Sequence, residues 1–260
     1  MSTHALPPSG AAPMRRLTFH RPSELSKGMR DAMWAVVLLA VRGSREEFER
    51  GVNKMDEIWL LEVDGVVMGF GGVRLFHPEW RGRKCCVIFT GRVCLHPSVR
   101  GNSILQRIGF RYYMQRLKAN PLRRIYWMFG AGSFKSYLLL PRNFHTYWPR
   151  PGAELPARER ALLDAVAREF DDPLYRPGAS VMSHPGLVYV DGGIGVNPDD
   201  LRDADVAFYS RVNPGQPRGD DLVCLCPLTQ ANWAACLGRA LLRAVRPRPR
   251  TLTSSTDSRS

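Results

Sequence analysis

Several features that would assign this 260-residue chain to a class at once are scarce or missing. Its six cysteines form no C-x-x-C pair, and no histidine lies at zinc-ligand spacing from them, which argues against a zinc finger or ribbon. Its most apolar early run, Met33–Val41, has nine residues, far short of a membrane span, and is interpreted as a buried helix. The twin arginines of "MRRLTF" precede polar residues, not an apolar signal core. We therefore expect a soluble cytoplasmic protein with reduced, buried thiols and no membrane span.

Lysine is also scarce, because only five of the 37 basic residues are lysine and the rest are arginine. The formal net charge of +13 attracts anions such as nucleic acid, an acidic carrier protein or a phosphorylated cofactor. Biased genomic base usage produces the same arginine excess. No zinc-finger, helix-turn-helix or base-stacking signature accompanies the charge, so a basic nucleic-acid-binding protein is the least favoured interpretation.

The chain divides into four stretches of different composition. Residues 1–14 are rich in proline, alanine and serine, and residues 246–260 alternate arginine with proline and then turn serine-rich, so both ends are predicted to be disordered. Residues 15–145 show a regular succession of elements and are predicted to form the core. Residues 146–245 are less regular and are predicted to be an extension that completes the sheet and the substrate pocket.

Residues 15–145 are predicted to form a strand, two helices, three strands, a helix, a strand and a helix. The strands are expected at 15–19, on both sides of the Asp64-Gly65 turn within 58–76, at 84–97 with a bulge at Gly91, and at 123–130. The helices are expected at 23–41 with Ser23 as N-cap, at 44–55 with Ser44 as N-cap, at 102–119, and at 133–140, where Pro141 ends the helix.

The extension is predicted to hold an amphipathic helix over 156–170, strands at 186–193, 205–212 and 220–228, and a closing helix over 230–245. Cys224 and Cys226 alternate as two residues on one face of a strand would. Such a mixture of strands and helices indicates an α/β or α+β fold, and we predict an α/β fold with a mixed central sheet flanked by helices and an α+β extension.

The stretch "VCLHPSVRGNSIL" carries the chemistry, because a strand ends there and a helix begins at once. Pro97 ends the strand ladder, and Arg100 supplies a guanidinium suited to phosphate oxygens. The small residues 101–103 would leave the backbone N–H groups of the helix N-terminus open to an anion. The alternative is that Asn102 or Ser103 merely caps the helix and that Arg100 is solvated.

The order of elements, together with the string "VCLHPSVRGNSI", resembles the GNAT (Gcn5-related N-acetyltransferase) superfamily, in particular larger bacterial acyltransferase-like members with a C-terminal extension. The resemblance covers residues 15–145. It implies that the backbone of the central strand pairs with the pantetheine arm of acyl-CoA and that the following loop holds the pyrophosphate. The donor-binding residues implied are Val93, Cys94, Leu95, Arg100, Gly101, Asn102, Ser103 and Ile104.

Two positions depart from the pattern of that superfamily. Ser103 and Leu105 stand where its pyrophosphate loop has small residues. The bulk of Leu105 would crowd a pyrophosphate. The alternative donor is therefore an acidic acyl-carrier protein, whose phosphopantetheine lacks the nucleotide. The aromatic segments "IYWMF", "HTYW" and "RYYM" would either line an acyl channel or pack in the core.

The resemblance also implies a tyrosine on the last short helix as the acid that protonates the leaving thiolate, and Tyr137 is the candidate, although Leu139 stands at the usual position. For the base, His96, His145, Glu62 or a chain of water molecules are the options. Cys94 has no activating neighbour in the sequence, and direct transfer needs no covalent enzyme intermediate.

These observations predict an N-acyltransferase. It would move an acyl group, of medium or long chain if the aromatic segments line a channel, from acyl-CoA or an acyl-carrier thioester to a primary amine of a small molecule or peptide. The alternative is a catalytically silent acyl-CoA-binding or regulatory module. No metal is predicted.

Overall fold

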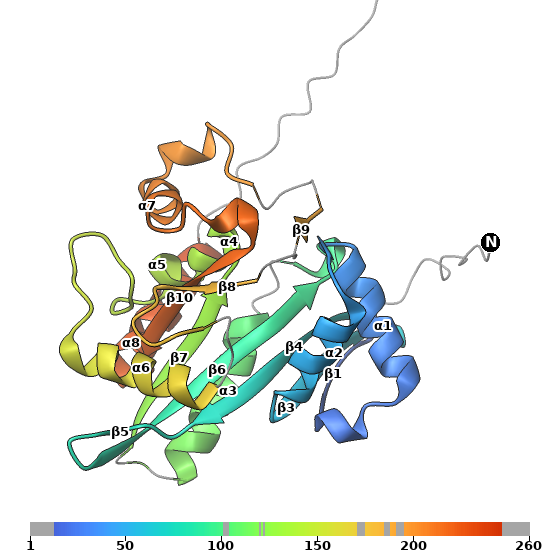
Figure 1. Cartoon of the computed structure of the whole chain (residues 1–260), viewed down its shortest axis with the longest axis horizontal. Helices are drawn as coiled ribbons and strands as arrows, with labels where there is room; N and C mark the ends of the chain where they lie inside the picture. The colour runs from blue at the N-terminus through green and yellow to red at the C-terminus, as the bar shows by residue number, and fades with distance from the viewer. Residues whose placement is uncertain are drawn as a thin grey trace, which may run out of the picture.

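The computed structural model describes residues 13–100, 104–119, 121, 123–170, 175–184, 188–190 and 195–245. Its centre is an eight-stranded sheet with the order β1-β3-β4-β6-β7-β10-β8, in which β5 pairs with β6 alone. Among the described strands, β6 and β7 form the parallel pair of this sheet and the other neighbours are antiparallel. Two short strands, β2 and β9, pair separately (Figure 1). The predicted mixed central sheet is confirmed.

The bounds of the elements follow the chain. The strands are β1 (Arg15–His20), β2 (Val41–Arg42), β3 (Glu57–Val63), β4 (Val66–Phe76), β5 (Glu79–Trp80), β6 (Arg83–Leu95), β7 (Arg124–Ala131), β8 (Val181–Ser183), β9 (Val188–Tyr189) and β10 (Asp220–Pro227). The α-helices are α1 (Lys27–Leu38), α2 (Arg45–Asn53), α3 (Ile104–Ala119), α4 (Phe134–Tyr137), α5 (Leu139–Asn143), α6 (Ala157–Phe170), α7 (Ala204–Val212) and α8 (Gln230–Val245). Single 3₁₀ turns are η1 (Pro22–Glu24), η2 (Pro97–Val99), η3 (Asp200–Arg202) and η4 (Gln216–Arg218).

Two hydrophobic cores lie on opposite faces of the sheet, because alternate strand residues point to opposite sides. Helices α3, α4, α5, α7 and α8 contribute to the first core, and α1, α2 and α6 to the second (Figure 1). Cys224 and Cys226 are both buried in the first core, so they do share one face of β10. All six cysteines are free thiols.

The order of elements predicted for residues 15–145 is confirmed except that the structure adds the short strands β2 and β5 and divides the last helix into α4 and α5. The Ser44 cap is also confirmed, since its Oγ accepts the N–H groups of Glu46 and Glu47 at 3.2 and 3.4 Å. The Asp64-Gly65 turn also joins β3 and β4 as predicted, with φ of 49° and 79°. This left-handed geometry matches the twist of the hairpin, which is why Asp-Gly turns are favoured.

The predicted helix over 23–41 is wrong at both ends. Ser23 lies in the turn η1, and the extended ψ of 116° at Leu25 interrupts the chain before α1. Ser26 is the N-cap, since its Oγ accepts the N–H of Met29 at 3.2 Å. At the other end the apolar run leaves the core, because Leu38 is 48% exposed and Val41 belongs to β2.

Two further predictions are corrected. Residues 205–212 form α7 instead of a strand, because the Asp203 side chain accepts the N–H groups of Asp205 and Val206 and so caps a helix. Val206 and Tyr209 then face the core at helical spacing. Pro141 does not end a helix, since it lies in the first turn of α5, where a missing N–H costs nothing.

Along the described segments, no helix combines the length and the apolar character needed to cross a bilayer. The disorder predicted for residues 1–12 and 246–260 lies outside the described residues. Strands β8 and β10, from the predicted extension, join the sheet on the far side of β7 from β6.

Candidate functional site

The parallel strands β6 and β7 diverge in the middle of the sheet. They pair from Cys85 with Arg124 to Thr90 with Phe129, and then separate. Beyond this point β6 continues along β4 while β7 continues along β10, as the two green strands of Figure 1 show. No described strand lies on the β7 side of residues 91–95, so this edge can pair with an extended ligand. We call the divergence after Thr90 and Phe129 the fork.

A β-bulge bends β6 directly beyond the fork. Phe70 of β4 is opposite Cys94 and Gly72 is opposite Gly91, so β6 carries one more residue than β4 in this interval. Arg92 within the bulge has a φ of 55°. The bulge predicted near Gly91 is therefore confirmed, and bulges of this kind increase strand twist and are frequent beside active sites.

Helices α1 and α2 pack against the bulged end of β6. A Cβ on Gly51 of α2 would lie 2.3 Å from Nε of Arg92, so the absence of a side chain at Gly51 makes room for that guanidinium. The thiol of Cys94 donates to the Val36 carbonyl of α1 at 3.4 Å. Burial raises the pKa of Cys94 to about 11, so this thiol is not an activated nucleophile at neutral pH.

The predicted donor-binding residues follow the fork in order. Val93 is 38% exposed, and the carbonyl of Leu95 accepts a hydrogen bond from Nε of the exposed Arg100 at 3.1 Å. Residues 101–103 lie outside the described residues, and Ile104 begins α3. Leu105 packs against the first core. The role of these residues in binding a donor stays a prediction.

His96 closes the end of β6. Its backbone N–H donates to the Met68 carbonyl of β4 at 2.8 Å, and its ring Nδ1 accepts the backbone N–H of Ser98 at 3.3 Å. The imidazole is therefore the N-cap of the turn η2. This capping bond orients the ring along the turn that leads to Arg100.

Tyr137 is fully buried in α4. Its hydroxyl donates to the Pro149 carbonyl at 3.1 Å, and its ring lies edge-on to Tyr147 and tilted against Phe208 and Tyr209. Burial raises the pKa of Tyr137 far above its ordinary value. Such a phenol holds its proton tightly, which disfavours Tyr137 as the acid that protonates the leaving thiolate.

His145 lies on the surface after α5. Its backbone N–H donates to Oδ1 of Asn232 in α8 at 3.0 Å, and its ring Nδ1 lies 3.2 Å from Oγ1 of Thr146. Among the described residues, no hydrogen bond joins Tyr137, His145 and His96 to one another. The aromatic side chains of the three segments considered for an acyl channel are buried in the two cores: Tyr112, Tyr113, Tyr126, Trp127, Phe129, Tyr147 and Trp148.

An ion pair that the sequence did not suggest lies beside the fork. Nε2 of His184, just after β8, is 3.4 Å from Oδ2 of Asp221 at the start of β10, and the two side chains are 19% and 20% exposed. A Cβ on Gly130 of β7 would lie 3.0 Å from Oδ2 of Asp221. The carboxylate therefore extends over β7 one residue beyond Phe129, on the face that α1, α2 and α6 cover.

The sequence carries only a weak signal for this pair. Asp221 stands in "GDDLVCLC", where two acidic residues open a strand, and His184 precedes a Pro-Gly turn. Neither segment carries a sequence signal that it pairs with the other. The antiparallel pairing of β8 with β10 brings them together. Within the described residues no three His, Cys, Asp or Glu side chains form a cluster that could hold a metal ion.

Comparison with known proteins returns solved structures alone. No family model and no curated protein matches the chain. A probable N-acyltransferase from Enterococcus faecalis is 10% identical over 85% of this chain and 74% of its own, with a TM-score of 0.43. An IAA acetyltransferase from Bacillus cereus is 10% identical over 83% of this chain and all of its own, with a TM-score of 0.36.

A third match, a predicted acetyltransferase from Clostridium acetobutylicum with acetyl-CoA, is 13% identical over 55% of this chain and 96% of its own, with a TM-score of 0.37. GCN5-related N-acetyltransferases are named among these matches. At identities of 10–15% and TM-scores of 0.36–0.43, these matches carry nothing about substrate or residues.

Proposed function

We propose that this chain, which resembles the GCN5-related N-acetyltransferases in fold, is an N-acyltransferase that takes an acyl group from a thioester donor to a primary amine. The observation that carries the proposal is the fork: β6 leaves β7 after Thr90, no described strand pairs with its β7-facing edge over residues 91–95, and the turn η2 follows on the way to α3. An extended pantetheine arm would pair with the edge, and its phosphates would meet the N–H groups of the helix start.

The donor proposed is acyl-CoA, held by residues 91–95, Arg100 and the turn that leads into α3. Leu105 does not oppose it, since this side chain packs against the core. An acyl-carrier protein would present the same phosphopantetheine arm without the nucleotide, and the positive net charge of +13 would suit its acidic surface. In either case residues 15–145 would bind the donor and residues 146–245 would shape the acceptor side.

The acceptor amine would approach on the face of α1, α2 and α6, where Asp221 lies over Gly130. In the proposed step the carboxylate of Asp221 takes a proton from the ammonium or attacking amine. The nitrogen lone pair forms the N–C bond to the thioester carbonyl carbon, the C–S bond breaks, and its electron pair leaves on the thiolate. His184 would hold the carboxylate in place through their 3.4 Å contact.

The histidines considered from the sequence remain candidates for the base, but their contacts favour Asp221. His96 uses Nδ1 to cap a turn, and His145 lies on the surface beside α8. The position of Asp221 over Gly130, on the strand next to the fork, supports this choice.

Titration of the protein with CoA, acetyl-CoA and a long-chain acyl-CoA tests the donor site, with an Arg100→Gln variant beside the native chain. We expect binding that raises the melting temperature and weakens by about tenfold in the variant, since a charge-assisted hydrogen bond contributes about 1.5–3 kcal/mol. The response to chain length would show which acyl group fits. A carrier protein that binds where CoA does not would support the carrier-thioester donor instead.

Thiol release in the presence of an amine panel separates an enzyme from the alternative, a silent acyl-CoA-binding module. An enzyme releases free thiol in proportion to acylated amine. Tight donor binding with no thiol release from any amine would favour the silent module.

A further inference from the structure

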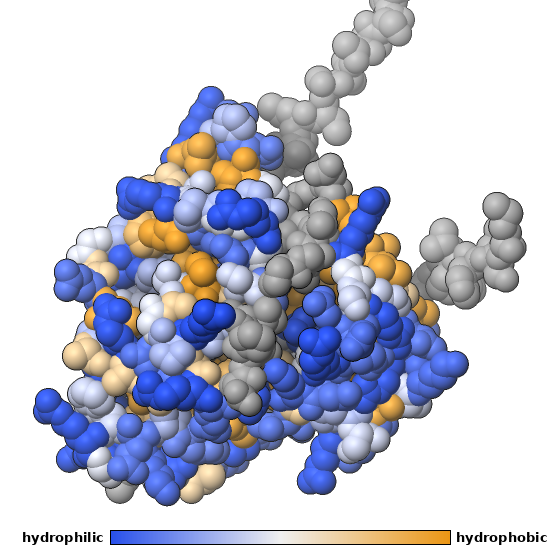
Figure 2. Space-filling view, viewed as in Figure 1, coloured by the Kyte–Doolittle hydropathy of each residue, from blue (hydrophilic) through white to orange (hydrophobic). Residues whose placement is uncertain are grey.

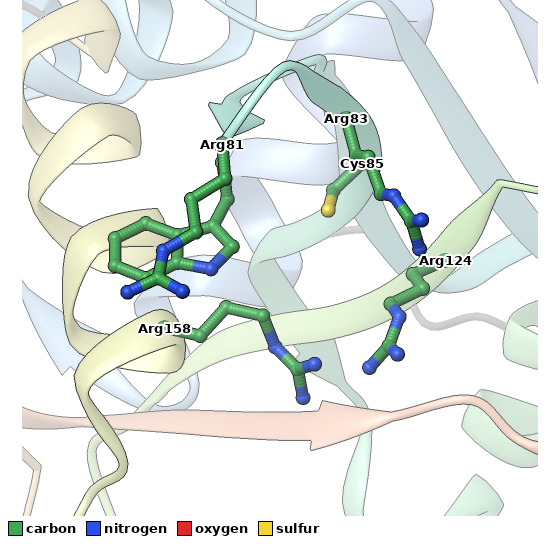
Figure 3. Close-up of a pocket in the computed structure, with 6 residues that line it drawn as sticks. Arg81, Arg83, Cys85, Arg124 and Arg158 are labelled. Atoms are coloured by element: carbon green, nitrogen blue, oxygen red, sulfur yellow. The ribbon is translucent and has the colours of Figure 1, made fainter.

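A second hollow lies at the opposite end of the parallel strands from the fork. It has a volume of about 340 Å³ and is lined by Trp80, Arg81, Arg83, Cys85, Arg124 and Arg158. These residues come from β5, the β5–β6 turn and the starts of β6, β7 and α6 (Figure 3). Cys85 and Gly91 are six positions apart on β6, so about 20 Å of strand separates this hollow from the nearer end of the donor edge. We call it the arginine pocket.

The fold itself directs these arginines to one place. Arg83 precedes Cys85 by two residues, and Arg124 pairs with Cys85 across the parallel ladder, so all three project on the face that α6 covers. The β5–β6 hairpin turns through Arg81 and Gly82, with φ of 48° and 71°, and returns Trp80 beside Arg83. Figure 3 shows the side chains of Arg124 and Arg158 extending toward one another beneath this hairpin.

Of the four lining arginines, Arg158 is paired with a carboxylate among the described residues. Glu159, 1% exposed, accepts hydrogen bonds from Nη2 of Arg158 at 2.5 Å and from the Tyr126 hydroxyl at 3.1 Å. The guanidinium of Arg81 lies 5.3 Å from the ring centre of Trp80. In the part of the chain that the structure describes, no ion pair within 4.0 Å is found for Arg81, Arg83 or Arg124.

Arg81, Arg83 and Arg124 are exposed and therefore solvated, but like charges gathered around one hollow repel one another, and a bound anion would relieve that repulsion. Some arginines elsewhere are paired, such as Arg30 and Arg45, which share Glu49 at 2.5 and 2.6 Å. Other described arginines, such as Arg218, lack an ion pair as well, so the distinguishing feature here is that four arginines line one hollow. Arg158 also lies in the first turn of α6, where the helix dipole disfavours a cation but favours a bound anion.

We propose that the arginine pocket binds a small anion that carries two or more phosphate groups. Planar guanidinium groups bind phosphate oxygens through paired, charge-assisted hydrogen bonds, and several of them match a multiply charged ligand. A hollow of about 340 Å³ is within the usual range of small-molecule sites and larger than one phosphate needs. Hydrophilic side chains gather over β5 and the start of α6 at the lower left of Figure 2, so the ligand reaches the hollow through a polar rim.

The proposal is independent of acyl transfer, because the arginine pocket shares no residue with the fork. A ligand held by α6, β6 and β7 at their common end would stabilise the sheet on which both sites stand. The same phosphate chemistry could come from a free inorganic oligophosphate or from the phosphates of a nucleotide. Trp80 at the rim offers an aromatic face that a nucleotide would use and an inorganic ion would not.

Isothermal titration with inorganic tripolyphosphate, ATP and citrate tests the proposal on the whole chain without any acyl donor. The decisive variant is Arg83→Gln/Arg124→Gln, which removes two of the three lining cations that no described carboxylate pairs. The matched control is Arg202→Gln/Arg218→Gln, which lowers the net charge equally at exposed positions in η3 and η4. A third variant, Arg100→Gln, shows whether any of the binding occurs at the donor site.

We expect tripolyphosphate to bind the native chain, the control and Arg100→Gln with affinities within about twofold, and the decisive variant at least tenfold more weakly, as the loss of charge-assisted contacts requires. Tighter binding of ATP than of tripolyphosphate would identify a nucleotide as the source, and equal binding an oligophosphate. Equal affinity of the decisive variant and the control would overturn the proposal, and so would a preference for citrate.

Hydrogen exchange of the native chain keeps the test valid should the decisive variant fail to fold. Tripolyphosphate should slow exchange in residues 79–86, 123–126 and 157–160, which line or flank the arginine pocket. Protection confined to residues 104–107 would place the anion at the helix of the donor site and contradict the proposal. If random duplex DNA binds equally strongly and no local protection appears, the binding reflects the positive surface as a whole and not a site, which would contradict the proposal.

Discussion

Asp221 lies across Gly130. A Cβ at position 130 would come within 2.9 Å of the Asp221 Cβ and 3.0 Å of its Oδ2, so the carboxylate occupies the space that a side chain on β7 would fill. Because Gly130 follows the last residue of β7 that pairs with β6, this relationship brings an acidic group to the fork. The proposed acceptor side of the reaction depends on it.

A Gly130→Ala variant should displace the Asp221 side chain, since the added methyl cannot fit at these distances. We expect kcat to fall at least about tenfold, less than the roughly 10²–10⁴-fold that a positioned base contributes because the carboxylate is displaced and not removed, while CoA affinity stays within about twofold. Steady-state kinetics and donor titration measure the two effects. The control is Gly238→Ala in α8, where a Cβ meets nothing within 4 Å and alanine should stabilise the helix by up to about 1 kcal/mol. Full activity in Gly130→Ala would show that Asp221 takes no part in the reaction.

Asp221→Asn keeps the shape of the side chain and removes its ability to accept a proton. We expect kcat to fall by about 10²-fold or more. His184→Gln, which removes only the partner of the carboxylate, should lower kcat by less. A kcat within about twofold of the native value in Asp221→Asn would show that another group accepts the proton.

Tyr137→Phe separates the two roles open to this residue. As the acid predicted from the resemblance, Tyr137 would be needed for turnover, and its loss would lower kcat about 10²-fold. As a packing residue, it would lose only its hydrogen bond to the Pro149 carbonyl, at a cost of about 1 kcal/mol in the free energy of unfolding. Thiol-release kinetics and urea unfolding on one preparation distinguish these outcomes. We expect the smaller kinetic effect, because burial raises the pKa of this phenol.

Thr90→Val tests the last paired position before the fork. The buried Nε1–H of Trp127 donates to Oγ1 of Thr90 at 2.8 Å, and valine would leave that donor without a partner. We expect a loss of about 1–3 kcal/mol in the free energy of unfolding, seen as a melting temperature lower by about 2–4 °C per kcal/mol. Thr90→Ser retains the hydroxyl and should lose less. Equal losses in both variants would mean that the hydrogen bond contributes little.

Alkaline pH should unfold the chain through its buried tyrosines. Burial raises the pKa of Tyr126 to about 12, with the nearby Glu159 carboxylate adding to the shift, and burial also raises the pKa of Tyr209. Because an unfolded tyrosine ionises near pH 10, the native state holds more protons above that value, and stability is lost as pH rises from about 10 toward 12. Urea midpoints measured across this interval should fall. A midpoint that stays constant to pH 12 would contradict the burial of these phenols.

Much of the donor side of the site could be predicted from local sequence. The order of elements in residues 15–145 follows from hydrophobic periodicity, the Asp64-Gly65 turn and the Ser44 cap, which are short-range signals. Likewise, the strand end at Pro97 and the helix after it are encoded within a dozen residues. The errors at Ser23 and over 205–212 are also local, since one competing cap, Ser26 or Asp203, decided each helix.

The acceptor side could not be predicted, because it depends on pairings between distant segments. Asp221 and His184 meet only through the antiparallel ladder of β8 and β10, and Asp221 reaches the fork only because β10 lies against β7. No sequence motif indicates the arginine pocket either, because its residues come from a hairpin, two strand starts and a helix. Long-range register, not residue type, creates both arrangements.

Hydrogen exchange of the whole chain with and without acetyl-CoA tests the central claim most directly. Binding at the fork should slow exchange of the amides in residues 91–95 and in the first turn of α3, while residues 83–86 at the far end of β6 keep their rates. Protection that omits residues 91–95, or no binding of acetyl-CoA or of any longer acyl-CoA or carrier thioester, would contradict the account.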